Sequence, residues 1–375
     1  MGYKTEMYSR FDRHSKQVSE FNLELTKENF IEQFKRLIDH QIPSLAQFLT
    51  ILKQATALLK QRPNVVQIVP KPNQKIVVVG DLHGNFESLI RLFVGDEKSE
   101  IQPIGFPSND LIYVFNGDFT DLGGSGYQII FSLCFMLLFS DSVYLNRGNH
   151  ESLSLGASTT FSSGHSFIYE MNEKFPEQRE FYSPLLDFFS SLPLATQIQD
   201  VLVVHGGTPS TQYSINQLNT VNRFVQDLEP VPSTPENAFH EFLWSYNRNS
   251  KTASFLMQNK LQTLVVGHSS ASFHSIYTFT KQLELHSIVK DETMFQKVKQ
   301  MFGVGSNERL SVVEVFSSPT NGGELYAAVI ECPNGRINND PLKWEYFKIG
   351  QTQRLQTEAQ MRITYNTAYS LNFAK

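Results

Sequence analysis

Five apolar runs in this chain each end beside a glycine and at least one aspartate, asparagine or histidine. Short apolar runs bounded by glycine are typical of buried strands. The polar residues that follow the five runs are, in order, Asp81 with His83, Asp118, Asn149 with His150, His205, and His268. Binding sites in open α/β sheets lie at the carboxyl ends of the strands. The pattern therefore predicts strands whose ends bring these side chains together in one site.

The segments between and around these runs predict helices. Helical periodicity is present in TKENFIEQFKRLIDHQ, with Thr26 as N-cap, in SLAQFLTILKQATALLKQRP up to Pro63, and in NFESLIRLF, GYQIIFSLCFMLLFSD and FYSPLLDFFSSLP. Alternation of strands and helices predicts an α/β fold with both faces of the sheet covered. Near the C-terminus, RLSVVEVF and ELYAAVIEC predict a β pair with a turn at PTNGG.

The composition limits the classes of function. The 375 residues fit one large or two ordinary domains, and a net charge of -5 gives no whole-protein reason to bind nucleic acid. Two cysteines, Cys134 and Cys332, form no disulfide framework and indicate a reducing, cytoplasmic-type environment. The longest apolar run, residues 129–139, is too short to span a bilayer, so we expect a soluble protein. The oligomeric state stays open.

The polar side chains at the strand ends form a chemically coherent set. Carboxylate, amide and imidazole groups are ligands for divalent metals. Any single segment is weak support, because a lone histidine is more often structural and a short GNHE segment alone fits a simple turn. Five such segments, each directly after an apolar run, favour a shared metal site.

The segments GDLHGN, GDFTDLGG, RGNHE, HGG and GH resemble, in this order, the motifs of the PPP family of metallophosphoesterases, which includes the serine/threonine protein phosphatases. LWSY at 243–246 and FSSPTNGG at 316–323 are also similar to segments of that family. The resemblance implies a central β-sandwich flanked by helices, with the active site at the strand C-terminal ends. The domain boundaries that we expect are a polar arm over 1–25, a catalytic domain over 26–345 and a polar tail over 346–375. The catalytic domain would include a helical lead-in over 26–66 and a helical insertion at about 283–305.

The resemblance also implies a centre with two divalent metal ions, with Mn²⁺ as the first choice and iron or zinc as alternatives. Carried over residue by residue, Asp81, His83 and Asp118 would hold one ion. The other would be held by the bridging Asp118 together with Asn149, His205 and His268. A hydroxide bridging the two ions would attack the phosphate directly.

The acid of the reaction follows from the same resemblance. Asp121 would orient His150, and His150 would protonate the leaving group as general acid. A phosphoprotein carrying phosphoserine or phosphothreonine is the implied substrate, with phosphotyrosine left open. The alternatives are a small-molecule phosphoesterase, such as a dinucleoside-polyphosphate hydrolase, and a catalytically inactive binding module.

The chain departs from the family pattern at Leu122, where the family has a phosphate-gripping arginine. Arg248 is the candidate for the phosphate grip, Arg223 is a weaker one, and Arg147 is expected to be structural. The segment from His274 to Arg309 is longer than in the family and includes a predicted amphipathic helix. These departures resemble the bacterial effector-type branch (WipA/WipB-like phosphatases), which would place the protein in a host cell.

Overall fold

The computed structural model describes residues 17–96, 100–157, 166–209, 213–227, 235–246, 250–268, 276–279, 285–289, 310–315, 317, 323–338, 341 and 344–352. Arg248 lies outside these residues, as do residues 1–16 and 353–375, and most of the segments 274–309 and 316–323.

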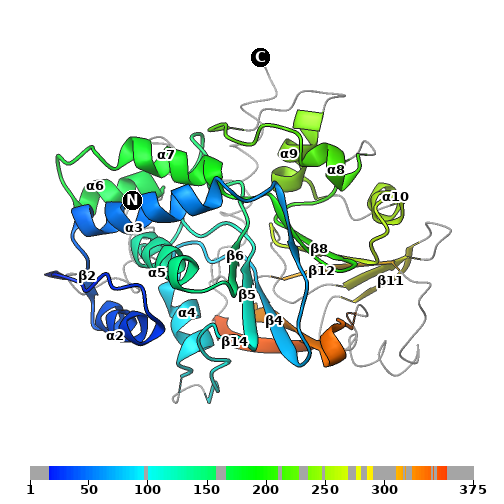
Figure 1. Ribbon diagram of the computed structural model, residues 1–375, viewed down its shortest axis with the longest axis horizontal. Coiled ribbons are helices and arrows are strands. Elements are labelled where there is room, and N and C mark those ends of the chain that lie inside the picture. Colours follow the sequence, from blue (N-terminus) through cyan, green and yellow to red (C-terminus); the bar gives the residue numbers. More distant parts are fainter. Residues whose placement is uncertain are drawn as a thin grey trace.

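Two large sheets form the centre of the molecule (Figure 1). The five-stranded sheet has the order β14-β13-β4-β5-β6. Its strands are β4 (Gln74–Val79), β5 (Leu111–Phe115), β6 (Val143–Leu145), β13 (Gly323–Cys332) and β14 (Glu345–Thr352). The seven-stranded sheet has the order β11-β10-β12-β9-β8-β7-β3. Its strands are β3 (Val65–Ile68), β7 (Ala195–Ile198), β8 (Val201–Val204), β9 (Thr263–Val266), β10 (Ile276–Phe279), β11 (Leu285–Val289) and β12 (Leu310–Glu314).

Helices cover the outer face of each sheet (Figure 1). The group beside the five-stranded sheet is α2 (Lys27–Ile38), α3 (Leu45–Leu59), α4 (Phe86–Phe93), α5 (Gly126–Phe139), α6 (Phe167–Lys174) and α7 (Tyr182–Ser191). The group beside the seven-stranded sheet is α8 (Ile215–Leu218), α9 (Pro235–Trp244) and α10 (Ser250–Gln258). A short parallel pair, β1 (Gln17–Val18) with β2 (Gln41–Ile42), lies beside α2, and the 3₁₀ turn η4 (Pro333–Gly335) follows β13. The predicted α/β fold with a central β-sandwich flanked by helices is confirmed.

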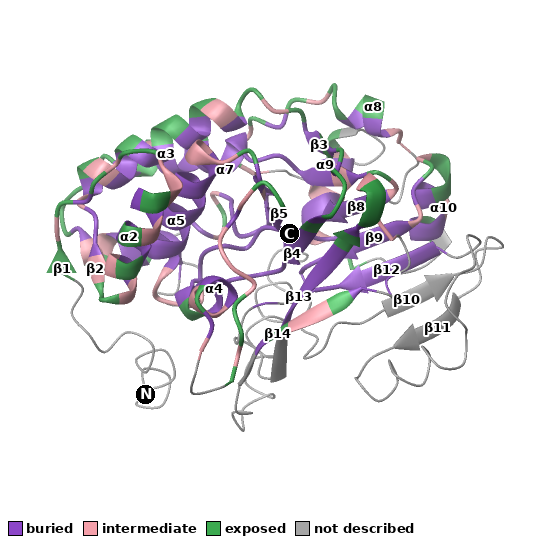
Figure 2. Ribbon diagram, turned by 60° about the horizontal axis from the view of Figure 1, so that its bottom comes forward, coloured by how far each residue is buried: buried purple, intermediate pink, exposed green. Residues whose placement is uncertain are grey.

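Alternation along the strands explains the layers. Val77 and Val79 of β4 belong to the helical core, whereas Ile76 and Val78 belong to the core between the two sheets. In β8 the even-numbered valine and leucine side chains likewise pack outward against α9 and α10. Because both faces are buried along β8 and along residues 76–79 of β4, these stretches are apolar throughout. Figure 2 shows β8, β9 and β12 buried along their length, while α3 keeps one exposed face.

The helices begin where the sequence provides caps. The Thr26 side chain accepts a hydrogen bond from the Asn29 backbone N–H, as predicted, and Ser44 forms a capping box with Gln47 at the start of α3. Helix α5 is apolar on all sides because it is buried among α2, α3, α6 and the sheet. Cys134 within it is a fully buried free thiol, and burial raises the pKa of this thiol.

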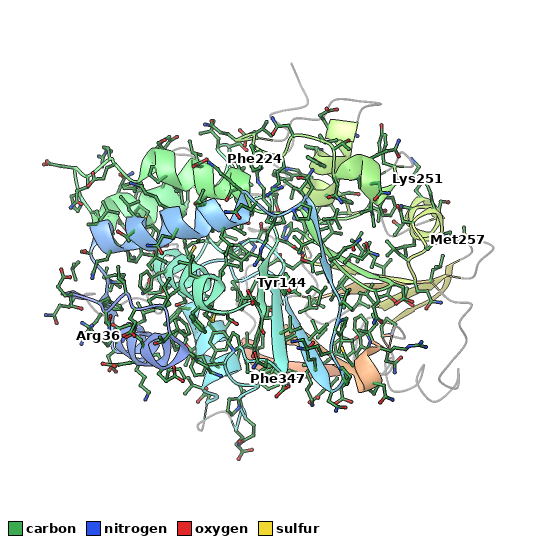
Figure 3. All side chains as sticks on the ribbon, in the orientation of Figure 1. Arg36, Tyr144, Phe224, Lys251, Met257 and Phe347 are labelled. Atoms are coloured by element: carbon green, nitrogen blue, oxygen red, sulfur yellow. The ribbon has the colours of Figure 1, made fainter. Side chains whose placement is uncertain are left out.

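Side chains fill the space between the layers (Figure 3). Tyr144 lies near the middle of the molecule, where it packs against the core between the sheets, while Met257 on α10 lies at the outer edge. Among the helices that the structure describes, none has the length and apolar character to cross a membrane.

The prediction that RLSVVEVF and ELYAAVIEC pair with each other is wrong. Strand β12 pairs with β9 and β10 in the seven-stranded sheet, whereas β13 pairs with β4 and β14 in the five-stranded sheet. The connection therefore crosses from one sheet to the other instead of forming a hairpin. Ser317, within this connection, accepts a hydrogen bond from the Gly80 backbone N–H at 3.0 Å and donates to the Tyr326 carbonyl at 2.8 Å.

Three expected boundaries also need correction. Residues 285–289 are not helical but form β11, which pairs antiparallel with β10 at the edge of the seven-stranded sheet. The polar tail does not begin at 346, since β14 pairs with β13 through Thr352. The end of the N-terminal arm is also packed: the ring of Phe21 is 5% exposed and lies edge-on to Phe131 at 5.7 Å.

Candidate active site

The topology brings the five predicted segments to one edge. β4, β5 and β6 are parallel neighbours in one sheet, and β8 and β9 are parallel neighbours in the facing sheet. The carboxyl ends of parallel strands lie at the same edge of a sheet. The contacts described below join residues from both sheets, so the two edges meet there.

Asp118 lies at the centre of the cluster and is 1% exposed. Its Oδ2 atom is 3.2 Å from His205 Nε2, 3.6 Å from His83 Nε2 and 3.9 Å from His150 Nε2. Its Oδ1 atom accepts a hydrogen bond from the His150 backbone N–H at 3.0 Å. Burial by itself would raise the pKa of this carboxyl, but His205 and His150 hold it well below its usual range. A single anionic oxygen thus faces three imidazoles.

Two of these imidazoles are oriented by backbone carbonyls. His83 Nδ1 lies 3.2 Å from the Thr120 carbonyl oxygen, and His205 Nδ1 lies 2.8 Å from the Asn116 carbonyl oxygen. Because only an N–H can pair with a carbonyl, Nδ1 carries the proton in both rings. Their Nε2 atoms therefore face the centre of the site, in the orientation that a metal ligand needs.

The two rings differ in charge. Burial lowers the pKa of His83 to about 4, which leaves this ring neutral. At His205, burial opposes the charged form, yet Asp118 and Asp81 raise the pKa to about 9. His205 Nε2 lies 2.8 Å from Asn149 Oδ1 as well as beside Asp118, so two oxygens converge on it. That position suits either a proton or a cation that displaces it, and this donor set fits a divalent ion.

Asp81 and His268 complete the cluster. Asp81 Oδ1 accepts a hydrogen bond from the His268 backbone N–H at 3.1 Å, and burial raises the pKa of Asp81 to about 7. The ring of His268 lies between aromatic neighbours: its centroid is 5.2 Å from that of His205 and 4.3 Å from that of Tyr246, which stacks on it. A Cβ at Gly267 would collide with Asp81 Oδ1, so glycine is required for this approach.

His150 and Asp121 form a separate buried pair. The Nδ1 atom of His150 is 2.6 Å from Asp121 Oδ2, and Asp121 Oδ1 accepts the Phe167 backbone N–H at 2.6 Å. Burial works against the imidazolium, but the charges of Asp118 and Asp121 outweigh it and raise the pKa of His150 to about 9. The ring is therefore protonated at neutral pH in the ion-free protein, as a general acid must be.

The backbone of the site is strained. Five non-glycine residues there have positive φ values: His83 (44°), Asp118 (52°), Asp121 (68°), Leu122 (64°) and His268 (47°). Non-glycine residues in this region cost on the order of 1–3 kcal/mol each, and such residues gather at functional sites. The packing of the two sheets and the buried hydrogen bonds hold them in place.

Sequence reasoning missed the role of Glu151, although this residue lies within the RGNHE segment. Its fully buried carboxylate accepts hydrogen bonds from the backbone N–H groups of Asp118, Phe119 and Gly148, at 2.8, 2.9 and 2.9 Å. It therefore joins the two turns that carry Asp118 and His150. The sequence did contain a signal for this role of Glu151: a carboxylate directly after His150, in a turn that follows a strand and contains Gly148.

The arginines are placed as follows. Arg147 donates to the carbonyls of Glu151, Val225 and Gln226 and is fully buried, which confirms the prediction of a structural role. Arg223 donates to the carbonyls of Leu59 and Ser191 and to the Asn64 side chain, so it ties the end of α3 to α7. The suggestion that Arg223 grips phosphate is wrong for this reason. Arg248 lies outside the described residues.

The ligand atoms of the cluster form two overlapping groups of three, each with atoms within 4.8 Å of one another: His83, Asp118 and His150, and Asp118, His205 and His268. Asp118 belongs to both groups, which agrees with its predicted bridging position. The first group includes His150, the predicted acid, and leaves out Asp81, a predicted ligand. Distance alone therefore does not separate the acid from the ligands.

Several known proteins are similar to this chain in sequence. Serine/threonine-protein phosphatase with EF-hands 1 from Homo sapiens is 30% identical over 58% of this chain and 31% of that protein. Serine/threonine-protein phosphatase T from Schizosaccharomyces pombe is 33% identical over 59% of this chain and 43% of that protein. The chain thus spans less than half of the length of these curated relatives.

A solved structure and a family model extend the likeness. A protein serine/threonine phosphatase from Saccharomyces cerevisiae superposes with a TM-score of 0.62 at 23% identity, covering 88% of this chain and 98% of the other, which shows a shared fold. The model of the calcineurin-like phosphoesterase family matches residues 74–276, more than half of the chain, and this range contains every predicted site residue. The chain belongs to the calcineurin-like phosphoesterase family.

Proposed function

We propose that this protein is a metal-dependent phosphoprotein phosphatase that hydrolyses phosphomonoesters on serine and threonine. The observation that carries the proposal is the convergence of three imidazole Nε2 atoms on Asp118 Oδ2, with one of the three rings held by a second carboxylate. The names of the relatives support a phosphoprotein as the substrate class.

The donor set supports two divalent ions. Asp81, His83 and Asp118 would hold one, and Asp118 with Asn149, His205 and His268 would hold the other. Mn²⁺ is our first choice, with iron or zinc as alternatives, because the donors are oxygen and imidazole. When bound, such ions neutralise phosphoryl oxygens and lower the pKa of a coordinated water towards neutrality.

His150 supplies the proton. Its Nδ1–H is held by Asp121, so Nε2 carries the second proton towards the centre of the site. As the bond between phosphorus and the leaving oxygen breaks, that oxygen takes the bonding electron pair and then the proton from Nε2. Asp121 keeps the ring in register and stabilises its positive charge.

The phosphate grip stays assigned to Arg248. The guanidinium groups of Arg147 and Arg223 donate to backbone carbonyls and, for Arg223, to the Asn64 side chain. Neither therefore replaces the family's phosphate-gripping arginine, whose place is taken by Leu122. Arg248→Ala should raise KM and lower kcat/KM, while Arg179→Ala, at an exposed position, should change neither. An unchanged Arg248→Ala enzyme would assign the grip to another residue. The absence of the family's arginine at position 122 also supports our proposal that the chain belongs to the bacterial effector-type branch of the PPP family.

The direct test uses protein that has been stripped with a chelator and reloaded with Mn²⁺. We expect hydrolysis of p-nitrophenyl phosphate, and faster release of phosphate from phosphoserine and phosphothreonine peptides than from dinucleoside polyphosphates. The reverse order would favour a small-molecule phosphoesterase. Bound metal without turnover would identify an inactive binding module. A phosphotyrosine peptide in the same panel shows whether the enzyme prefers phosphotyrosine to phosphoserine and phosphothreonine.

A further inference from the structure

Helices α5 and α6 begin without side-chain caps of their own. Neither Ser125 before α5 nor Ser166 before α6 forms a capping hydrogen bond. The first N–H groups of a helix need acceptors when they are buried. In this protein each helix receives a carboxylate from the segment of the other, and one of these carboxylates is Asp121.

Asp121 serves the start of α6. Its Oδ1 atom accepts the backbone N–H of Phe167, the first residue of α6, at 2.6 Å, while its Oδ2 atom faces His150 Nδ1. The N-terminus of a helix favours a negative charge. The position of α6 therefore determines where this carboxylate can lie and how it meets the imidazole.

Glu170, on α6, serves the start of α5. Its Oε2 and Oε1 atoms accept the backbone N–H groups of Gly126 at 2.9 Å and Tyr127 at 3.0 Å. Lys174, one turn further along α6, lies 3.0 Å from Glu170 Oε1 and donates to the Gly124 carbonyl at 3.2 Å. Helix α6 thus contacts the segment 121–127 at its first residue, near its middle and at its end.

This attachment counteracts strain. Asp121 and Leu122 have φ values of 68° and 64°, a conformation that ordinary side chains adopt only when the surroundings hold it. The segment 121–127 is also fixed to the turn that carries His83, a proposed metal ligand, and these contacts do not involve α6. The backbone N–H groups of Gly123 and Ser125 donate to the carbonyls of His83 and Gly84. Loss of the contacts from α6 would therefore disturb Asp121 more than the metal ligands.

We propose that Glu170 is a positioning residue for the acid pair: through α5 and α6 it keeps Asp121 aligned with His150. This inference rests on the proposed phosphatase function. Glu170 contacts the backbone of Gly126 and Tyr127 and the side chain of Lys174, so it acts on the acid pair through the backbone of the segment 121–127. The effect of its loss should therefore depend on how much the reaction needs a proton donor.

The experiment compares two esters with different leaving groups. Phenyl phosphate has a poor leaving group that needs the proton, whereas 2,4-dinitrophenyl phosphate has a good one that does not. For Glu170→Gln we expect kcat on phenyl phosphate to fall roughly tenfold, because small misplacements of a catalytic group carry large rate losses. On 2,4-dinitrophenyl phosphate we expect less than about a threefold fall. The number of bound ions should not change.

The matched control is Glu173→Gln, the same substitution at an exposed position of the same helix, which should leave both rates unchanged. Lys174→Met is a milder second variant with the same direction of effect if Glu170→Gln does not fold, as judged by circular dichroism. In a His150→Asn background, Glu170→Gln should bring no further selective loss on phenyl phosphate.

Equal losses on both esters, or no loss on either, would show that Glu170 and Lys174 stabilise the fold only and would overturn the inference while leaving the proposed function intact. A wild-type protein that hydrolyses neither ester would overturn the proposed function, and this inference with it.

Discussion

His83 and His150 occupy almost equivalent places in the site, yet we assign them opposite tasks. Their rings are in edge-to-face contact with centroids 4.8 Å apart, and their Nε2 atoms lie 3.6 and 3.9 Å from the same Asp118 oxygen. The difference lies on the far side of each ring. His83 Nδ1 faces the neutral Thr120 carbonyl, whereas His150 Nδ1 faces the carboxylate of Asp121.

That difference helps to separate the charges of these two rings, because only His150 has the second carboxylate, Asp121, in addition to Asp118. Burial lowers the pKa of His83 to about 4, so this imidazole offers a lone pair at neutral pH. Burial acts in the same direction at His150, but Asp118 and Asp121 raise its pKa to about 9, so this imidazole keeps its proton. The hydrogen bond from Nδ1 to Asp121 therefore distinguishes the proposed acid His150 from the proposed ligand His83, while the distance to Asp118 does not.

Asp118 faces both the proposed ligand His83 and the proposed acid His150, so its substitution should have the largest effect on ion binding and activity. Asp118→Asn takes away the oxygen charge that faces all three imidazoles and belongs to both candidate ion sites. We expect the variant to lose both ions and to retain only background hydrolysis of p-nitrophenyl phosphate. Elemental analysis with the rate measurement checks this. Full ion content in Asp118→Asn would remove this residue from the centre of the account.

The second-largest expected effect concerns only the proposed proton donor, His150. His150→Asn removes the proton donor and should lower kcat on a phosphoserine peptide by roughly 10²–10⁴-fold, the usual contribution of general acid catalysis. Steady-state kinetics on the peptide and on 2,4-dinitrophenyl phosphate would measure it. The loss should be much smaller with the second substrate. A variant that works as well as the wild type on the peptide contradicts the assignment.

The third effect tests the carboxylate behind the ring. His150 must be protonated to act, so activity is present below its pKa and lost as the pH rises through it. Asp121→Asn removes a charge that raises this pKa, and the alkaline limb of the kcat profile should move to lower pH by roughly 1–3 units. A limb at the wild-type pH would mean that Asp121 does not hold the proton.

The smallest expected effect is the release of a proton from His205, a proposed metal ligand, when an ion binds. Asp118 and Asp81 raise the pKa of His205 to about 9 against the effect of burial, so this ring holds a second proton at pH 7.5. An ion that binds Nε2 must displace it, and we expect release of roughly one proton per chain. Titration calorimetry in two buffers with different ionisation enthalpies measures the release. Equal binding enthalpies in both buffers would show that no proton leaves.

Much of this site could be predicted from the sequence because its chemistry lies directly after apolar strands. Asp81, Asp118 and His205 each follow a run whose burial is encoded locally, and the parallel pairing then brings the ends together. Thr26 likewise marked the start of α2 by a local rule, whereas α3 ends at Leu59, four residues before the predicted end at Pro63. Such short-range signals need no knowledge of the partner segment.

The parts that were missed depend on contacts between distant segments. Glu170 accepts the backbone N–H of Gly126, 44 residues away, and its own sequence neighbourhood shows only an ordinary helical glutamate. Arg223 was suggested as a phosphate ligand because of its position in the chain, but it binds Leu59, 164 residues away. The separation of β12 and β13 into different sheets was hidden for the same reason, because two adjacent strand patterns fit a hairpin equally well.

The most direct test of the central claim is the metal content of His150→Asn after chelation and reloading with Mn²⁺, measured by inductively coupled plasma mass spectrometry beside the wild type. The account predicts two ions per chain in both proteins, together with the loss of activity in the variant. A variant that keeps one ion or none would make His150 a ligand, and the distinction between the two neighbouring histidines would be contradicted.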